Sequence, residues 1–342
     1  MAFLASLVSR FAGVTPWATR LSGRLFSDPF SYLVGKPLER RLLTYELPAG
    51  SLVLANDADV VDAVMLDRSG GFPKSALVYE LLRPMIGQGV FGQPGGEAVR
   101  RMRRVFIRAL ARIPDTVVAE TARTLTAAYL ERWLASNSRK IPVCSELSRL
   151  TVDIVSEAAL GARFDERQSR RFVELFFAYQ EQAMPLVLLL AKGRNGEARK
   201  LVANMGLVEI GAEMRELIRQ RFVEPLMEGD PATNRSVFAT ALAADGSLAA
   251  AGPTSGTNEA RKDALLDQVA VMLLAGHETT ASVLSWLIWE LASRPGDQEA
   301  LSGIIAGTAQ GSLITLAPQA WSGVTATKLV DSLIKETLRL YP

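Results

Sequence analysis

Apolar residues recur at helical spacing along most of the chain, and strand-like spacing is confined to a short region near the N-terminus. Leu42 to Leu47 and Leu52 to Ala55 mix apolar and polar residues on either side of the turn-forming run Pro48-Ala49-Gly50-Ser51. This pattern predicts a hairpin at about 42–55.

A helix is expected to follow the hairpin, because Asn56 or Asp57 can cap it and Gly70-Gly71 can stop it. A buried stripe is predicted on that helix from Val60, Val61, Val64 and Met65. A second helical run, Ala76 to Leu82, is expected to end before Pro84.

Beyond a loop-rich stretch to Gly96, the pattern predicts helices at about 97–112, 115–136, 144–161, 166–192, 196–228, 259–293 and 328–341. Two segments rich in Gly, Ser and Thr, 246–258 and 303–327, are expected to be irregular. Because apolar stripes continue on both sides of each loop, we predict a mainly α fold. It would form one large domain over 1–342 with a small β element.

Composition excludes several classes of protein. The 342 residues are 49% hydrophobic and 22% charged, which is globular composition, and a net charge of +2 is too even for a nucleic-acid-binding protein. One Cys and one His, Cys144 and His277, cannot form a Cys/His zinc site or a disulfide within the chain. Ser-His-Asp or Cys-His catalysis could run only through His277, or through Cys144 with His277.

No uninterrupted apolar run is long enough for a transmembrane anchor, so we expect a cytoplasmic protein. Residues 1–27 contain no acid and carry apolar residues at helical spacing. We interpret them as a surface helix, with peripheral membrane contact or a transit-like segment as the alternatives.

Gly87-Gln88-Gly89-Val90-Phe91-Gly92 matches the glycine pattern that binds dinucleotides. The context does not match, because no strand precedes it and Gln93-Pro94-Gly95 stands where a phosphate-binding helix should begin. A flexible loop is the preferred interpretation.

Six arginines gather on one predicted helix, at 100, 101, 103, 104, 108 and 112. They could form an ordinary solvated face, or a patch that binds an acidic protein partner or an anionic ligand group.

The most unusual segment is Val269 to Leu291, which is apolar nearly all round, as a central buried helix should be. Its middle nevertheless reads Ala275-Gly276-His277-Glu278-Thr279-Thr280. Thr279 can bond the carbonyl of Ala275, and Gly276 leaves room for a flat group near the backbone. A helix kink is possible, but a ligand or proton-handling site is the preferred interpretation.

Glu336 and Arg339 stand three residues apart on the last predicted helix, within Leu333 to Pro342. They can form an ion pair of a common kind, which alone identifies nothing.

Together these segments resemble the cytochrome P450 family, the haem-thiolate monooxygenases. Ala275 to Thr280 is similar to the family's oxygen-activation helix, and Lys335-Glu336-Thr337-Leu338-Arg339-Leu340-Tyr341-Pro342 is similar to its E-x-x-R helix. The order and spacing of the two motifs also agree.

The resemblance implies a haem cofactor, iron protoporphyrin, with Ala275 and Gly276 against the porphyrin and Glu278 and Thr279 delivering protons during oxygen activation. His277 would stand behind these residues. The resemblance further implies that Glu336 and Arg339 form a structural pair. Arg103 would reach a haem propionate, although the aromatic residue or His usual four positions earlier is Val99 here.

The same resemblance implies electrons from NAD(P)H through a ferredoxin or a flavin-containing reductase. Such a partner would bind the basic face near Arg100, Arg104 and Arg108. The largely apolar stretches at about 72–92 and 170–200 suggest a hydrophobic small-molecule substrate.

One departure from the family is large: its axial Cys lies in a Gly-rich loop well beyond the E-x-x-R helix, and this chain ends at Pro342. Cys144 is expected to be a buried packing residue. We therefore expect a C-terminally truncated chain without an axial ligand, inactive alone as a monooxygenase. The alternatives are a peroxide-using relative and a catalytically dead helical ligand-binding or regulatory protein.

Overall fold

The computed structural model describes residues 39–47, 50–66, 71–74, 76–136, 140–190, 202, 206–228, 238, 258–308 and 325–341. The expectations for residues 1–27 and for the segments 246–257 and 309–324 lie outside these residues. The chain divides into two compact units. One combines Met1–Leu81 with Gln180–Leu207, and the other combines Leu82–Tyr179 with Val208–Pro342.

The predicted hairpin is present in the first unit. Strands β1 (Leu42–Leu47) and β2 (Gly50–Ala55) are antiparallel, and their register pairs Leu42 with Ala55 and Leu47 with Gly50. The predicted hairpin is confirmed, although Gly50 and Ser51, which were expected in the turn, belong to β2 and pair with Leu47 and Glu46.

Helix α3 (Ala58–Met65) follows the hairpin, with Asp57 at its N-cap. The Asp57 carboxylate accepts the backbone N–H of Asp59 at 3.1 Å and the Nε–H of Arg41 at 2.6 Å. The predicted buried stripe is wrong, because α3 buries none of its residues and Met65 is 76% exposed. The capping contact of Asp57 therefore fixes where α3 begins, and burial of an apolar face does not contribute.

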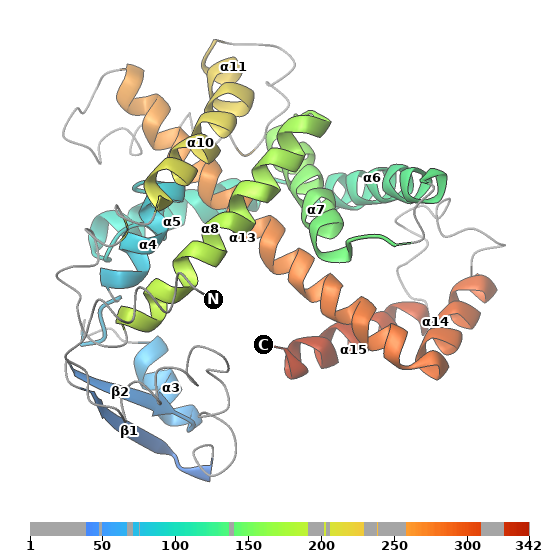
Figure 1. The fold of residues 1–342 in the computed structure, drawn as a ribbon, viewed down its shortest axis with the longest axis horizontal. Coiled ribbons are helices and arrows are strands. Elements are labelled where there is room, and N and C mark those ends of the chain that lie inside the picture. The colour runs from blue at the N-terminus through green and yellow to red at the C-terminus, as the bar shows by residue number, and fades with distance from the viewer. Residues whose placement is uncertain are drawn as a thin grey trace, which may run out of the picture. The chain divides into compact units, whose positions relative to one another are not determined.

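The remaining helices are α4 (Ala76–Ile86), α5 (Glu97–Leu110), α6 (Asp115–Ala135), α7 (Val143–Leu160), α8 (Glu166–Leu190), α10 (Leu207–Ile218), η4 (Arg219–Val223), α11 (Glu224–Met227), α13 (Asn258–Ser293), α14 (Pro295–Thr308) and α15 (Thr325–Leu340). Most begin and end within a few residues of the predicted positions, which confirms a mainly α fold (Figure 1).

Three boundaries differ from the prediction. Pro84 lies inside α4, which loses one backbone hydrogen bond there and continues to Ile86. The single helix expected at 196–228 is interrupted by the π-helical turn η4, because Pro225 has no N–H for the carbonyl of Arg221 and the N–H of Glu224 bonds Arg219 instead. Helix α14 occupies the beginning of a region expected to be irregular.

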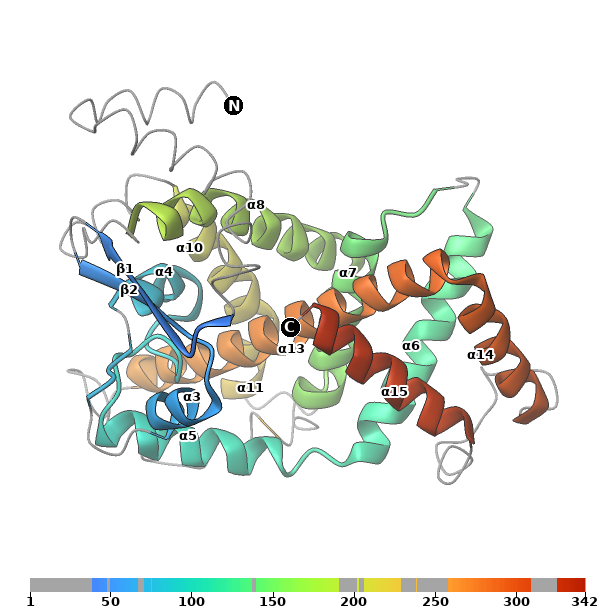
Figure 2. The ribbon, with the colours of Figure 1, turned by 90° about the horizontal axis from the view of Figure 1, so that it is seen from below.

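The core of the second unit is built around α13. Helix α7 packs along it, and α14 and α15 contact its C-terminal half (Figures 1 and 2). The buried side of α13 includes Leu265, Leu266, Val269, Ala270 and Leu273, each almost completely removed from solvent. Leu147 and Leu150 of α7 share a hydrophobic cluster with Ala281 of α13 and Leu125 of α6. Removal of these side chains from water fixes which side of α13 faces inward.

Among the described helices, α13 also has the length and apolar composition that a membrane span requires. The central helix of a folded unit meets the same criteria, so this is weak evidence for a span.

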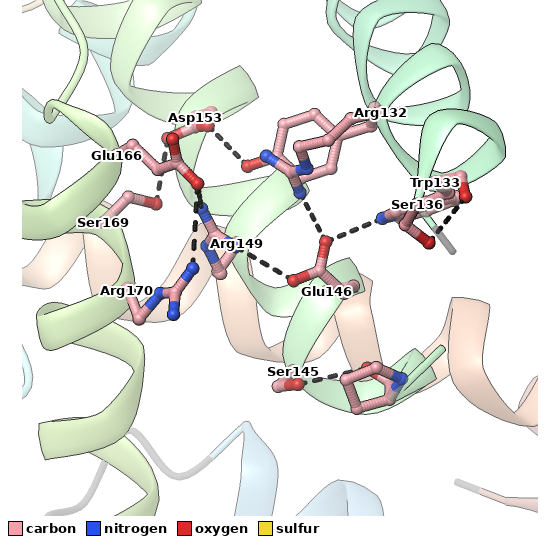
Figure 3. Close-up of polar contacts among 12 residues, drawn as sticks. Arg132, Trp133, Ser136, Ser145, Glu146, Arg149, Asp153, Glu166, Ser169 and Arg170 are labelled. Atoms are coloured by element: carbon pink, nitrogen blue, oxygen red, sulfur yellow. Dashed lines mark hydrogen bonds and ion pairs between the residues drawn. The ribbon is translucent and has the colours of Figure 1, made fainter. Parts of the chain in front are cut away.

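A polar network joins α6 to α7 beside the core (Figure 3). Glu146 of α7 accepts hydrogen bonds from Trp133 at 2.7 Å, from Arg149 at 2.9 Å and from Arg132. Partial burial acts to raise the pKa of Glu146, but the hydrogen bonds from Trp133 and Arg132 hold it below its ordinary value. This carboxylate is therefore ionised when the network forms.

The network continues from α7 to α8. Asp153 of α7 accepts the hydroxyl of Tyr129 at 2.6 Å and that of Ser169 at 3.2 Å. Burial raises the pKa of Asp153 in spite of these two hydrogen bonds. Together the two acids hold α7, which packs on α13, between its neighbours α6 and α8.

Replacement of Glu146 by Ala removes the short ion pair of Arg149, whose side chain is only 7% exposed, and leaves it the longer pair with Glu166 at 3.7 Å. We expect the free energy of unfolding to fall by about 2–4 kcal/mol in chemical denaturation. The control is Glu120→Ala, which breaks the exposed pair with Arg123 on α6 and should leave the unfolding midpoint unchanged. Equal midpoints for the two variants would contradict this account of the network.

Candidate functional site

The polar segment of α13 has the local geometry that the sequence predicted. The hydroxyl of Thr279 donates to the carbonyl of Ala275 at 2.8 Å, which confirms that expectation, and the hydroxyl of Thr280 donates to the carbonyl of Gly276 at 2.9 Å. Both threonine side chains keep lone pairs on the oxygen that can accept a proton or a hydrogen bond.

The segment differs from expectation in its exposure. A fully buried helix was predicted, whereas Ala275, Thr279 and Thr280 are exposed, Glu278 is half-buried, and Trp289 further along is 61% exposed. Successive residues of a helix are rotated by about 100°, so Ala275 and Thr279 share one side and His277 lies nearly opposite them. The helix therefore has a packed side and a free side.

His277 is the side chain that this segment buries completely. Its Nδ1 lies 2.8 Å from the carbonyl of Leu273, and its ring meets Phe172 and Phe176 of α8 edge-on, with centroids 5.7 and 4.7 Å away. Burial lowers the pKa of His277 to about 4. The imidazole is therefore neutral near pH 7, with the proton on Nδ1 and no hydrogen-bond partner at Nε2 among the described atoms.

Gly276 lies against α7. A methyl group at its Cα would come within 2.9 Å of Cγ2 and 3.2 Å of Cγ1 of Val155. Nearby, the hydroxyl of Thr151 donates to the carbonyl of His277 at 3.0 Å. The missing side chain thus permits close approach of α7 and α13, and contact of Gly276 with a flat cofactor stays a prediction.

The arginines of α5 lie on its exposed side, whereas Val99, Met102, Val105, Phe106 and Ala109 are buried. Glu97 accepts from Arg100 at 3.1 Å and from Arg104 at 3.4 Å. Arg103 is exposed, and in the described part of the chain it has no ion pair or hydrogen bond. Contact of its guanidinium with a haem propionate remains a prediction.

Glu336 and Arg339 form the expected pair on α15, with two hydrogen bonds of 2.6 and 2.7 Å. The hydrogen bond from Arg339 holds the pKa of Glu336 below its ordinary value. Nearby, Tyr341 stacks on Trp286 of α13 at 3.9 Å between centroids, and its hydroxyl donates to Glu290 at 2.6 Å. These contacts join the segment after α15 to α13.

Cys144 is exposed near the start of α7, so the expectation of a buried packing residue is wrong. Its neighbour Val143 packs against the hydrophobic cluster that includes Leu147 and Leu150 of α7, whereas Cys144 itself is exposed. Among the described residues, no three His, Cys, Asp or Glu side chains are grouped so that they could hold a metal ion.

The Gly87–Gly92 segment is a loop, as predicted, and its glycines are closely packed, whereas its flexibility stays a prediction. Gly89 and Gly92 are buried, and a methyl group on Gly89 would lie 2.5 Å from Cγ2 of Val271 on α13. Sequence reasoning missed the acid that holds this loop, Asp267 of α13. Its signal was an Asp-Gln pair within the apolar run Leu265 to Leu274.

Comparisons with known proteins agree on one family. The sequence matches the family model described as Cytochrome P450 over residues 40–342. It is 26% identical to cyclooctatin synthase of Streptomyces melanosporofaciens, over 96% of this chain and 68% of that protein. It is also 26% identical to cytochrome P450 monooxygenase 205 of Postia placenta, over 69% of this chain and 47% of that protein.

The fold comparison points the same way. The crystal structure of the cytochrome P450DA heme domain superimposes with a TM-score of 0.65 at 16% identity, over 91% of this chain and 67% of that one. This likeness concerns the fold alone. The chain spans about half to two thirds of the length of these relatives.

The close approach of Gly276 to Val155 can be tested by a double substitution. Gly276→Ala gains helix propensity but overpacks the contact, so we expect a net loss of about 1 kcal/mol in unfolding free energy. With Val155 shortened to Ala, the same change should stabilise the protein by up to about 1 kcal/mol. Chemical denaturation of the four proteins measures this reversal of sign, and equal effects in both backgrounds would contradict the contact.

The buried imidazole predicts a pH dependence of stability. The folded pKa of about 4 lies below the ordinary 6.5, so the unfolded chain binds this proton first as the pH falls. The contribution is fully present above pH 6.5 and is lost toward pH 4, by about 3 kcal/mol in total. It should disappear in His277→Leu, measured as the difference between the two proteins. Because the chain has one His, an NMR titration reads its pKa directly, and a midpoint near 6.5 would contradict burial.

Proposed function

The chain belongs to the cytochrome P450 family, and from this membership we propose that its α13 forms the distal side of the haem site of a monooxygenase. Members of the family use haem to insert one atom of dioxygen into a substrate. The observation that supports the proposal is the free side of α13, where Ala275 and Thr279 are exposed together beside a small, hydroxyl-bearing stretch of helix.

The described residues fit one side of a haem. Ala275 presents only a methyl group on the free side of α13, so a flat ring could lie against the helix there. The hydroxyl of Thr279, one turn further on, would stand at the edge of that contact. Arg103 and its exposed guanidinium are available for a carboxylate of the cofactor.

The described residues provide no thiolate that could hold the iron of such a haem. Thiolate ligation requires a Cys facing the free side of α13, and Cys144 lies on α7, which packs against the opposite side of that helix. His277, the only imidazole, also points into the packed side, toward α8. No step is therefore assigned to the metal in this chain.

Thr279 and Glu278 are proposed to handle protons. The hydroxyl of Thr279 donates to the carbonyl of Ala275 and can accept a further hydrogen bond. It can therefore relay a proton, because Oγ1 can accept one proton while the hydroxyl gives up its own. Glu278, the preceding residue, is half-buried and supplies a carboxylate that can take up and return that proton. Glu336 and Arg339 are proposed to stabilise α15, as their ion pair suggests.

We further propose that the exposed arginines of α5 bind an acidic ferredoxin or a flavin-containing reductase that carries electrons from NAD(P)H. Arg100 and Arg104 share Glu97, so their charges are only partly neutralised on the helix. The substrate is proposed to be a hydrophobic small molecule, and the protein is proposed to act in the cytoplasm.

The axial position can be tested with the 342-residue chain itself. After addition of haemin and reduction under carbon monoxide, we expect no red-shifted absorption band of the kind that thiolate ligation produces. If the reading frame continues beyond Pro342 and encodes a Cys in a Gly-rich loop, the extended protein should show the band. A thiolate band from the 342-residue chain would contradict this prediction. A genuine stop codon would instead favour a binding or regulatory protein.

Proton handling can be tested in that extended protein. Thr279→Ala and Glu278→Gln should lower product formed per NAD(P)H consumed by about tenfold or more, because general acid catalysis is lost. Thr280→Ala is the matched control, since it removes a hydroxyl that bonds the backbone of the same helix one residue later. If all three variants couple electrons to product equally well, the roles of Thr279 and Glu278 are wrong.

A further inference from the structure

Three segments that are distant in sequence meet at the carboxylate of Asp267. The backbone N–H of Gln88 donates to its Oδ2 at 2.8 Å, and Nη2 of Arg215 on α10 lies 2.7 Å from its Oδ1. Asp267 itself is on α13 and is 7% exposed. One buried acid therefore contacts the Gly87–Gly92 loop and α10 together.

The loop backbone lies directly on this ion pair. Gly87 has a φ of 54°, in the region that favours glycine, and a methyl group there would overlap Oδ1 of Asp267 and come within 2.7 Å of Nη1 of Arg215. Further along, Val90 is buried and Gly89 approaches Val271. The glycines at these positions are thus explained by how closely the loop approaches Asp267 and α13.

Stability alone is a weak reason for such a pair. Burial raises the pKa of Asp267 in spite of Arg215, and Nη1 of Arg215 has no hydrogen-bond partner among the described atoms. Buried ion pairs of this kind can often be replaced by apolar residues without loss of stability. Two apolar side chains, however, could not accept the N–H of Gln88 and at the same time bind α10 through an ion pair.

We propose that Asp267 is a positioning residue that holds the Gly87–Gly92 loop in place against α13. We call this placement the seating of the loop, and Asp267 links it to α10. The loop covers α13 at Val271, one helical turn before Ala275. The position of the loop therefore determines the shape of the free side of α13 next to Ala275. We call this side, where a ligand is proposed to bind, the ligand side. This last consequence rests on the proposed function, whereas the seating of the loop does not.

Hydrogen exchange in the 342-residue chain tests the seating. Asp267→Ala should raise exchange at the amides of residues 88–92 by about tenfold or more, with α6 and α7 unchanged. Asp267→Asn keeps an acceptor for Gln88 but loses the charge, so it should give a smaller rise. It also replaces the Ala variant if that protein does not fold.

The matched control is Asp263→Ala. Asp263 lies one turn earlier on α13, is exposed and pairs with Arg219 of η4 at 3.2 Å. This variant should leave exchange at 88–92 as in the wild type. If both Asp267 variants exchange like the control at these amides, Asp267 does not position the loop.

The ligand side requires the extended, haem-loaded protein and a hydrophobic substrate that it oxidises. Asp267→Ala should raise KM about fivefold or more while kcat changes less than about twofold, because binding geometry and not proton transfer is altered. An unchanged KM would overturn the effect on the ligand side. The exchange result is independent of haem, so failure of the proposed function and failure of the positioning role can be distinguished.

Discussion

The contact between α7 and α13 is the constraint on which the rest of the second unit depends. Gly276 lets the two helices approach closely because it lacks the side chain that would collide with Val155, and Thr151 donates to the carbonyl of His277 nearby. Since one side of α13 is committed to this contact, the rotation of the helix about its axis is fixed. The exposed position of Ala275 and Thr279 follows from what is packed opposite them.

The network around Glu146 and Asp153 supports that contact from behind. It binds α7 to α6 and α8 through groups that are partly or wholly removed from water, where hydrogen bonds are strong and a lost partner is costly (Figure 3). Helix α7 cannot move relative to its neighbours without breaking several of these bonds at once. A rigid α7 in turn gives α13 a fixed surface to pack on, so the network holds the polar segment of α13 through α7.

Local signals in the sequence predicted the helices, the hairpin and the bond from Thr279 to Ala275, because each depends on residues close together in the chain. The direction in which each residue faces in the folded unit was not predictable in the same way. Gly276 was interpreted as an opening for a cofactor, which stays a prediction, and only the position of Val155, more than a hundred residues earlier, shows that it also lies against α7. Met65 and Cys144 were assigned to a core by residue type, yet exposure depends on what the rest of the fold places beside them. Asp267 was overlooked because its partners, Gln88 and Arg215, are distant in sequence.

His277 has a practical consequence for work with this protein. As the only imidazole in the chain it is completely enclosed by α13 and α8, so the folded unit offers none to the solvent. A reagent that acylates histidine would find no target until the core opens, and one target afterwards. The extent of His277 modification therefore reports how often the core opens, and the measurement needs no label or engineered residue.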